Sequence, residues 1–190
     1  KSAAENICIA YENTYKIPLM IVNVMNAFGE RQHPEKFIPK CIHAVLKGEK
    51  VYIHSYPDKK TAGTRFYIHA RNIAAAVVFL LKNGSIGEKY NITGESEVSN
   101  LELAQFIAKT LRKELKYEMV NHHATRPGHD LRYGLSGEKM AKMGWVPPLG
   151  FEDSLRKCIE WTAINSQWLS LKQWADEPSS SDDVTTKSRL

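Results

Sequence analysis

The segment ATRPGHDLRY, which spans residues 124–133, concentrates polar side chains around a Pro-Gly turn. Arg126 offers a planar fork of donors whose shape matches a diphosphate. The Pro-Gly pair favours a tight turn that aims its neighbours, and His129 and Asp130 can form hydrogen bonds to sugar or ribose hydroxyls. Tyr133 adds a ring that can stack or form a hydrogen bond. A salt-bridged surface loop is the alternative, but so many chemistry-bearing side chains in one segment favour a site.

Two earlier positions also have the residue type and surroundings of a ligand contact. Asn26 follows the apolar run LMIVNV, and ligands of open α/β sheets bind outside the carboxyl ends of strands. Lys36 stands at the start of an expected helix, where the helix dipole does not favour a cation. A phosphate held between Lys36 and the amides of that helix would explain it. A turn asparagine and a solvated surface lysine are the corresponding alternatives.

Four polar residues in or beside strand-like runs have competing interpretations. Arg65 lies among strand-forming residues in GTRFYIH, so its charge must pair or extend to solvent, and it can hold a phosphate in a bidentate manner. His54 also lies in a strand-like run. We interpret His69 as a structural, hydrogen-bonded residue at the start of a helix, and Asn100 most simply as a helix N-cap.

The elements that must position these residues alternate between strands and helices, which predicts an α/β fold. Helices are expected at residues 2–15, 34–46, 70–82, from 99 or 100 onward, from 136 onward and 151–168. Strands are expected in LMIVNV, KVYIHSY, TRFYIH, GEKYNIT and KYEMVN, and NAFGERQHP is expected to be a loop. Residues 177–190 have almost no apolar content and are expected to be disordered.

Composition narrows the class of protein. The 190 residues are 43% hydrophobic and carry a net charge of +5, and no apolar run is long enough to span a membrane. Scattered lysines without an arginine-aromatic motif argue against nucleic-acid binding, and three isolated cysteines argue against a metal cluster. Cys8 and Cys158 fall on apolar helix faces, where buried, inert thiols are expected. The cysteine usage favours a reducing compartment, and we expect a cytoplasmic protein.

Several segments in order carry a resemblance to a known family. They are KSAAENICIAYENTY, NAFGERQHPEKFIPK, GEKYNITGESEVSN, RPGHDLRY, KMGWVPP and FEDSLRKCIEW. Together they resemble the carboxyl-terminal part of the extended short-chain dehydrogenases/reductases that act on nucleotide sugars, most closely the dTDP-glucose 4,6-dehydratases. The resemblance implies that residues 1–176 are part of a Rossmann-like NAD(P)-binding domain together with a smaller α/β substrate-binding lobe.

The family uses a Tyr-x-x-x-Lys pair, and the resemblance implies that Lys1 is its lysine, a catalytic residue that also holds the nicotinamide ribose of NAD. An ammonium beside a phenol lowers the pKa of that phenol. Ala27 takes a cofactor-contact position where the family has a second asparagine, so a side-chain contact is lost. Since the chain starts at Lys1 and not at Met, we expect a piece of a longer protein whose catalytic tyrosine and acidic pair lie upstream.

The resemblance also implies a set of residues that bind the nucleotide sugar. They are Asn26, Lys36, Phe37, Tyr52, His54, Arg65, Asn100, Arg126, His129, Asp130 and Tyr133. Tyr52 and His54 fall where the family has Pro-Val-Tyr around the base, so the resemblance leaves the preferred base open.

The implied activity is that of a lyase. The sugar C4 hydroxyl is oxidised with NAD, water is eliminated across C5 and C6, and the hydride returns to C6 to give a 4-keto-6-deoxy sugar. We expect a homodimer through helix 2–15, and we expect the 190 residues alone to be inactive and without stable NAD binding. The alternatives are an epimerase or decarboxylase of the same fold, and a nucleotide-sugar-binding module without catalysis.

Overall fold

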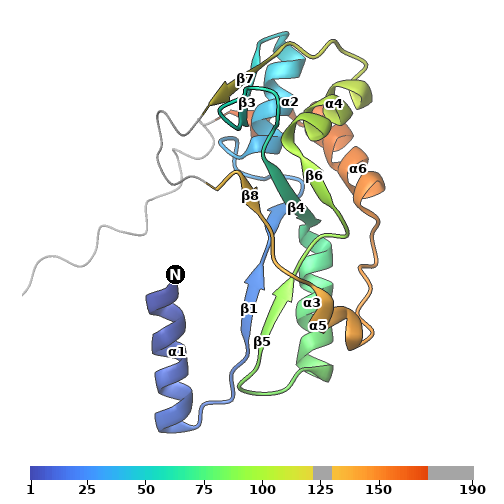
Figure 1. Ribbon diagram of the computed structural model, residues 1–190. Coiled ribbons are helices and arrows are strands. Elements are labelled where there is room, and N and C mark those ends of the chain that lie inside the picture. The colour runs from blue at the N-terminus through green and yellow to red at the C-terminus, as the bar shows by residue number, and fades with distance from the viewer. Residues whose placement is uncertain (122–129, 171–190) are drawn as a thin grey trace, which may run out of the picture.

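The structure is a computed structural model that describes residues 1–121 and 130–170 (Figure 1). The predicted disordered tail and the residues from 122 to 129 lie outside the described residues. The helices are α1 (Ser2–Tyr15), α2 (Phe37–Lys47), α3 (Ala70–Asn83), α4 (Asn100–Thr110), α5 (Glu138–Lys142), α6 (Phe151–Ile164) and the 3-10 helix η2 (Ser166–Leu169). The strands are β1 (Ile21–Val24), β2 (Asn26–Phe28), β3 (Val51–Ser55), β4 (Thr64–His69), β5 (Lys89–Ile92), β6 (Glu97–Ser99), β7 (Tyr117–Asn121) and β8 (Arg132–Tyr133).

Three small sheets connect segments that are far apart in sequence. In the first, β1 pairs with β5 in parallel, and in the last, β3 pairs with β7 in parallel. Between them, β4 is the centre of a sheet in which β2 and β8 are parallel neighbours and β6 is antiparallel. The mixture of short parallel strands with helices confirms the predicted α/β class.

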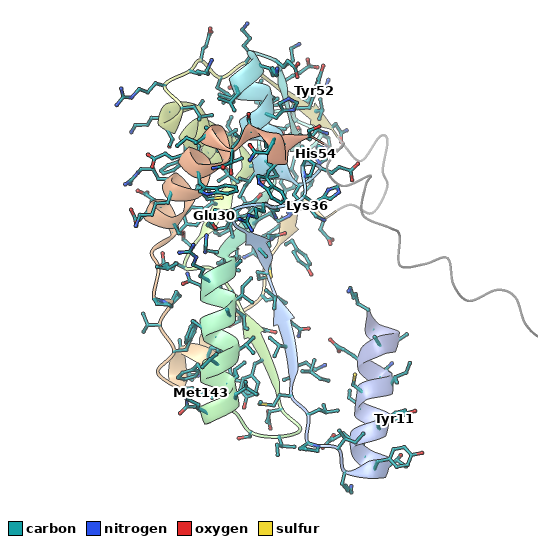
Figure 2. All side chains as sticks on the ribbon, turned by 180° about the vertical axis from the view of Figure 1, so that it is seen from behind. Tyr11, Glu30, Lys36, Tyr52, His54 and Met143 are labelled. Atoms are coloured by element: carbon teal, nitrogen blue, oxygen red, sulfur yellow. The ribbon has the colours of Figure 1, made fainter. Side chains whose placement is uncertain are left out.

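Helix α1 stands apart from the rest of the described fold. It runs beside β1 in Figure 1 and contributes no buried residue. Even its large apolar side chains are exposed, Ile7 at 60% and Tyr15 at 67%. Figure 2 shows Tyr11 on this helix, away from the remainder of the molecule. A salt bridge of 2.8 Å from Lys89 Nζ to Glu5 Oε2 links α1 to β5. No helix among the described residues is long and apolar enough to cross a membrane.

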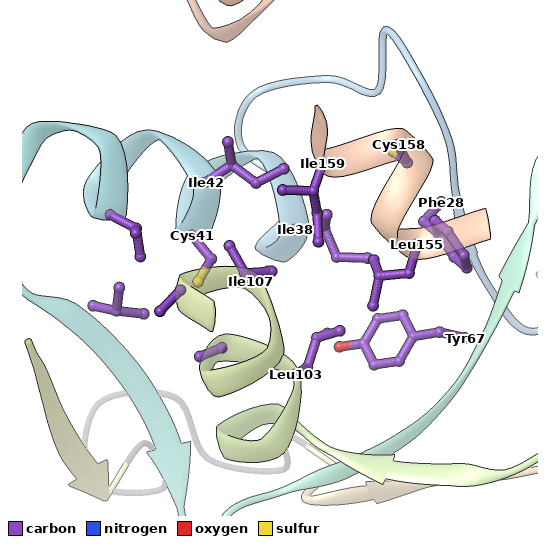
Figure 3. Close-up of a cluster of buried hydrophobic side chains, with 14 of the residues drawn as sticks. Phe28, Ile38, Cys41, Ile42, Tyr67, Leu103, Ile107, Leu155, Cys158 and Ile159 are labelled. Atoms are coloured by element: carbon purple, nitrogen blue, oxygen red, sulfur yellow. The ribbon is translucent and has the colours of Figure 1, made fainter. Parts of the chain in front are cut away.

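The first of two hydrophobic cores lies where α2, α4 and α6 meet. In Figure 3, Ile42 of α2, Ile107 of α4 and Ile159 of α6 converge, and all three are fully buried. The spacing of the buried residues of α2 is that of one helix face, which explains why this segment folds as a helix against the core. The residues of that face are Ile38, Cys41, Ile42 and Val45.

The second core lies under α3 and is separate from the first. It contains Ala76 and Leu80 of α3, Ile92 of β5 and Met140 of α5. Strand β4 contributes to both cores, because its side chains alternate between two faces. Its Tyr67 belongs to the first core and Ile68 to the second.

Four predictions about the positions of strands and helices and the burial of thiols were wrong. The segment NAFG is not all loop, because β2 pairs Asn26 with Tyr67 and Phe28 with His69 across a long sequence separation. The second helix begins at Phe37 and not at Pro34. The last helix ends at Ile164, and the separate 3-10 helix Ser166–Leu169 follows it.

The fourth wrong prediction concerns one of the cysteines. Cys8 is exposed because nothing covers its helix face within the described part of the chain. Cys41 and Cys158 are buried, and burial raises the pKa of each thiol to about 12, so both stay protonated and unreactive.

Candidate functional site

The connection between β2 and α2 carries Lys36 and is fixed on several sides. Gln32 Nε2 donates a hydrogen bond of 2.7 Å to the Ala27 carbonyl oxygen. Arg31 has a positive φ of 63°, and its guanidinium lies 5.8 Å from the ring centre of Trp161 and 5.3 Å from that of Trp168. These contacts tie the connection to α6 and η2, so the start of α2 has a defined position.

Lys36 itself is exposed at the N-cap position of α2 (Figure 2). Its backbone is extended, and no side-chain hydrogen bond caps this helix in the described structure. The first amides of a helix have no partner inside the helix and attract anions. The ammonium of Lys36 and the start of α2 therefore present two kinds of donor to an anionic group.

His69 is a buried histidine whose two ring nitrogens are both used. Nδ1 accepts a hydrogen bond of 3.2 Å from the amide of Arg71, and Nε2 lies 3.4 Å from Glu30 Oε2. Burial lowers the pKa of His69, although the Glu30 carboxylate opposes this shift, so the neutral ring donates from Nε2 to Glu30. The interpretation of His69 as a structural residue at the start of α3 is confirmed.

Asn26 and Phe37 are the first residues of the two elements that this connection joins. Asn26 is partly buried, and its Nδ2 donates to the Phe66 carbonyl oxygen at 3.3 Å. This bond crosses from β2 to β4 and fixes the amide group at the sheet. Phe37 packs on the first core and is only partly exposed.

The cap of α4 was predicted at Ser99 or Asn100, and the simpler interpretation of Asn100 as the cap was wrong. Ser99 is the N-cap, and it forms a reciprocal capping box with Glu102. Asn100 is 9% exposed, and its Oδ1 accepts a hydrogen bond of 2.7 Å from the hydroxyl of Tyr67. Burial raises the pKa of Tyr67, so its hydroxyl stays a donor to Asn100. In this structure the Asn100 oxygen therefore serves the core.

Tyr52 and His54 share one face of β3. The strand alternates, with Val51, Ile53 and Ser55 buried, Tyr52 58% exposed and His54 partly exposed. Figure 2 shows both side chains in the same upper part of the molecule as Lys36. The period of two therefore places both candidate base-binding residues away from the core.

Asp130, which ends the RPGHD motif, and the next residue, Leu131, are held against β4. Arg65 Nη1 donates hydrogen bonds of 2.7 Å to the carbonyl oxygens of Thr64 and Leu131, and Nη2 donates to that of Asp130. Asp130 is exposed and Tyr133 is 45% exposed. Arg126 and His129 lie outside the described residues. The roles predicted for these residues remain predictions.

Two described residues were predicted to contact NAD. Lys1 is exposed at the start of α1, and Ala27 is exposed in β2. The sequence contains no Gly-x-x-Gly-x-x-Gly loop for the cofactor diphosphate. The contacts of Lys1 and Ala27 with NAD remain predictions.

Sequence reasoning missed two carboxylates. Glu30 pairs with His69, and Glu97 forms a salt bridge of 2.8 Å with Arg132 Nε. The signal for Glu30 was its place directly after a strand and a glycine. Glu97 gave no signal, because β6 is three residues long and was not predicted. Among the described residues, no group of three or more His, Cys, Asp or Glu side chains could hold a metal ion.

The chain is similar to known proteins in both sequence and structure. Residues 1–93 match the family model of the NAD dependent epimerase/dehydratase family. The chain is 33% identical over 175 residues to dTDP-glucose 4,6-dehydratase 1 of Escherichia coli (strain K12), which covers 89% of this chain and 47% of that relative. The chain spans about half the length of the curated relatives it matches.

Two solved structures are similar to this chain in fold. A dTDP-glucose 4,6-dehydratase from Bacillus anthracis in complex with NAD matches with a TM-score of 0.77 at 32% identity, over 88% of this chain and 52% of that one. A dTDP-glucose 4,6-dehydratase from Streptomyces venezuelae with NAD and TYD bound matches with a TM-score of 0.78 at 30% identity, over 88% and 51% of the two chains. The α/β architecture is thus that of Rossmann-like nucleotide-sugar enzymes.

Proposed function

Because this chain belongs to the NAD dependent epimerase/dehydratase family, we propose that it supplies the nucleotide-sugar-binding part of an NAD-dependent dehydratase. The substrate is dTDP-glucose or a close analogue, and the product is a 4-keto-6-deoxy sugar. We assign residues 1–176 to this domain. The relatives named dTDP-glucose 4,6-dehydratase support the choice of reaction over epimerisation or decarboxylation.

The observation that carries the proposal is the exposed Lys36 at the uncapped start of α2. It combines a cation with helix amides, and the surrounding connection is fixed, so an incoming diphosphate meets donors that are already in place. Tyr52 and His54 take the base, and Asn26, Phe37, Asp130 and Tyr133 complete the contacts to the nucleotide sugar. Arg126 and His129 have the donor types for the diphosphate and the sugar.

Lys1 and Ala27 contact the cofactor in this proposal. The Lys1 ammonium donates to the ribose hydroxyls and lowers the pKa of a neighbouring phenol. Binding energy from the remote nucleotide holds the sugar while the reaction proceeds at its C4 to C6 atoms. We also propose a cytoplasmic location, which the three free cysteines support.

The test is calorimetric binding of dTDP to the chain. We expect Lys36→Ala to weaken dTDP binding by about tenfold, because a hydrogen bond to a charged group contributes roughly 1.5–3 kcal/mol. Lys40→Ala is the matched control, since Lys40 is also an exposed lysine of α2, one turn further on. Equal losses in the two variants would indicate diffuse charge attraction, and no binding by the unaltered chain would refute the proposed function.

We further propose a homodimer in which α1 of each chain packs on its partner. The supporting observation is that α1 buries none of its residues and leaves the apolar side chain of Ile7 60% exposed. We expect sedimentation equilibrium to give a dimer for the unaltered chain and a monomer for Ile7→Glu. Val146→Glu places the same charge at a residue that is 75% exposed elsewhere and should stay dimeric. A dimer that survives Ile7→Glu would exclude this interface.

A further inference from the structure

The connection between β2 and α2, residues 29–36, joins two places that the proposed function uses. Ala27 lies just before it in β2, and Lys36 is its last residue. Figure 2 shows Glu30 and Lys36 in the same region of the molecule. The connection consists of turns and bends and contains no strand or helix. Its position, and with it that of Lys36, therefore depends on side-chain contacts.

Three consecutive side chains of this connection extend to three different parts of the fold. Glu30 lies 3.4 Å from the histidine at the start of α3. Gln32 donates a hydrogen bond of 2.7 Å to the backbone of β2. Arg31, between them, reaches one tryptophan of α6 and one of η2. The connection is thus attached on three sides, and only Arg31 attaches it to the last two helices in this way.

The contact of Arg31 with the two tryptophans is a double cation–π interaction. The guanidinium carbon lies 5.8 Å from the ring centre of Trp161 and 5.3 Å from that of Trp168. Both distances are within the range of about 6 Å over which a cation is attracted to an indole ring. A guanidinium suits this use because it is planar and weakly hydrated. We name these three residues the Arg31 anchor.

The backbone of Arg31 indicates that the side-chain contact is needed. Its φ of 63° lies in the left-handed region, which is unfavourable for a residue with a long side chain. Such a conformation persists only where surrounding contacts hold it. The Arg31 anchor supplies contacts of that kind.

Packing beneath the connection is incomplete. A cavity of about 10 Å³, the space of a single water molecule, lies there and is lined in part by Gln32, Thr162 and Trp168. Gln32 Oε1 is buried and has no hydrogen-bond partner among the described residues. Close packing alone therefore does not hold the connection, and the Arg31 anchor provides more of the attachment.

A short series of hydrogen bonds carries the position of the connection to Lys36. The Lys36 amide donates to the His33 carbonyl oxygen at 3.0 Å, and the Glu35 amide donates to His33 Nδ1 at 3.3 Å. The Lys36 carbonyl oxygen in turn accepts a bond of 3.0 Å from the Lys40 amide in α2. Pro34, within this turn, is buried. A shift at Arg31 would thus be transmitted to Lys36.

We propose that the Arg31 anchor is a positioning device for the nucleotide diphosphate, which acts through Lys36. By holding the connection against α6 and η2, the anchor keeps the Lys36 ammonium and the first amides of α2 where the diphosphate binds. Arg31 and Trp168 are thus positioning residues. This inference rests on the proposed function for its consequence in binding, whereas the attachment of the connection can be tested without any ligand.

The first experiment is hydrogen exchange of the ligand-free chain, read by mass spectrometry on peptides that cover residues 29–36. We expect exchange there to be about fivefold faster in Arg31→Gln and about threefold faster in Trp168→Leu, since the first loses both cation–π contacts and the second loses one. Trp145→Leu is the matched control, because Trp145 packs on Phe79 beside the second core. It should leave these peptides unchanged. Unaltered exchange in both anchor variants would overturn the proposal.

The second experiment measures the dTDP affinity of the same variants by calorimetry, in conditions where circular dichroism shows that each is folded. Trp168→Leu changes no charge, so a loss of affinity in it reports position and not electrostatics. We expect losses of about threefold in Trp168→Leu and about fivefold in Arg31→Gln, and no change in Trp145→Leu. The double variant of Arg31 and Trp168 should lose little more than Arg31→Gln alone, because both residues act in one contact.

Arg31→Lys separates the charge of Arg31 from its stacking on the indole rings. It keeps the positive charge but replaces the planar guanidinium with a compact ammonium. The anchor predicts that lysine restores only part of the dTDP affinity and part of the protection against exchange. If Arg31→Lys binds dTDP as tightly as the unaltered chain and Trp168→Leu also has no effect, Arg31 acts through its charge alone and the inference is wrong.

The proposed function and the anchor fail in different ways. If the unaltered chain binds no dTDP, the proposed function fails and the anchor has no role in binding, whereas exchange at residues 29–36 still decides whether it holds the connection. If the anchor variants accelerate exchange without weakening dTDP binding, the anchor is purely structural and its positioning role is wrong.

Discussion

Replacement of Ile159 by alanine is expected to lower the free energy of unfolding by about 2–5 kcal/mol, the usual cost of removing a large buried aliphatic side chain. Ile159 is fully buried on α6 and lies in the first core with Ile42 and Ile107. These neighbours come from α2 and α4, so none can fill the space without moving a helix. The cavity would thus weaken three helices together. Urea denaturation followed by circular dichroism measures the loss.

The same helix provides a matched control for this substitution. Ile164 is the last residue of α6 and is 83% exposed, so Ile164→Ala should change the free energy of unfolding by no more than about 0.5 kcal/mol. If both variants lost the same stability, helix propensity and not burial would be responsible. The first core would then not have the packing described for it.

The second large effect is expected from Gly94→Ala. A Cβ atom at this position would lie 2.1 Å from the Tyr67 carbonyl oxygen, 2.9 Å from its carbonyl carbon and 3.2 Å from its amide nitrogen. All three atoms belong to the backbone of β4, the strand shared by both cores, so no side-chain rotation relieves the clash. We expect a loss of about 1–3 kcal/mol or more in the free energy of unfolding, measured by urea denaturation.

Gly29→Ala distinguishes this clash from the general cost of replacing a glycine. A Cβ atom there would meet Ala70 Cβ at 3.4 Å and His69 Nε2 at 3.8 Å, which are ordinary contacts. This variant should unfold within about 0.5 kcal/mol of the unaltered chain. A Gly94→Ala variant as stable as Gly29→Ala would show that β4 can shift at Tyr67, contrary to the close packing seen here.

The sequence was most informative where one element carries its own periodic pattern. The α2 segment has apolar residues at helical spacing and Gly48 at its end, and the structure places Gly48 there with a φ of 69°. The strand predicted in KVYIHSY is observed as β3, which alternates buried and exposed residues. In both cases local spacing and burial agree, so the sequence pattern alone was sufficient to predict the element.

Prediction failed where a partner distant in sequence decides the conformation. Residues Asn26–Phe28 form a strand only because β4 offers a parallel edge. Asn100 has the residue type of a cap, yet Tyr67 draws its side chain into the core while Ser99 takes the cap. Cys8 has an apolar helical neighbourhood, but no described element covers it. Contacts of these kinds have no local sequence signal.

The same distinction applies to the residues of the candidate site. Lys36 at the start of a helix followed from local sequence, and the structure places it there, exposed. The use of Arg65 on backbone carbonyls did not follow, because it depends on β8 lying beside β4. Chemical type indicates which residues are able to bind a ligand, whereas topology decides which of them are already engaged.

The alternation of β4 has a consequence for how the fold loses its order. Tyr67 supports one core and its neighbour Ile68 supports the other, so this strand belongs to both hydrophobic clusters. When either cluster opens, β4 loses the packing of one face and the other cluster loses one of its walls. Thermal unfolding should therefore be a single transition. The six residues of this strand thus couple the two clusters.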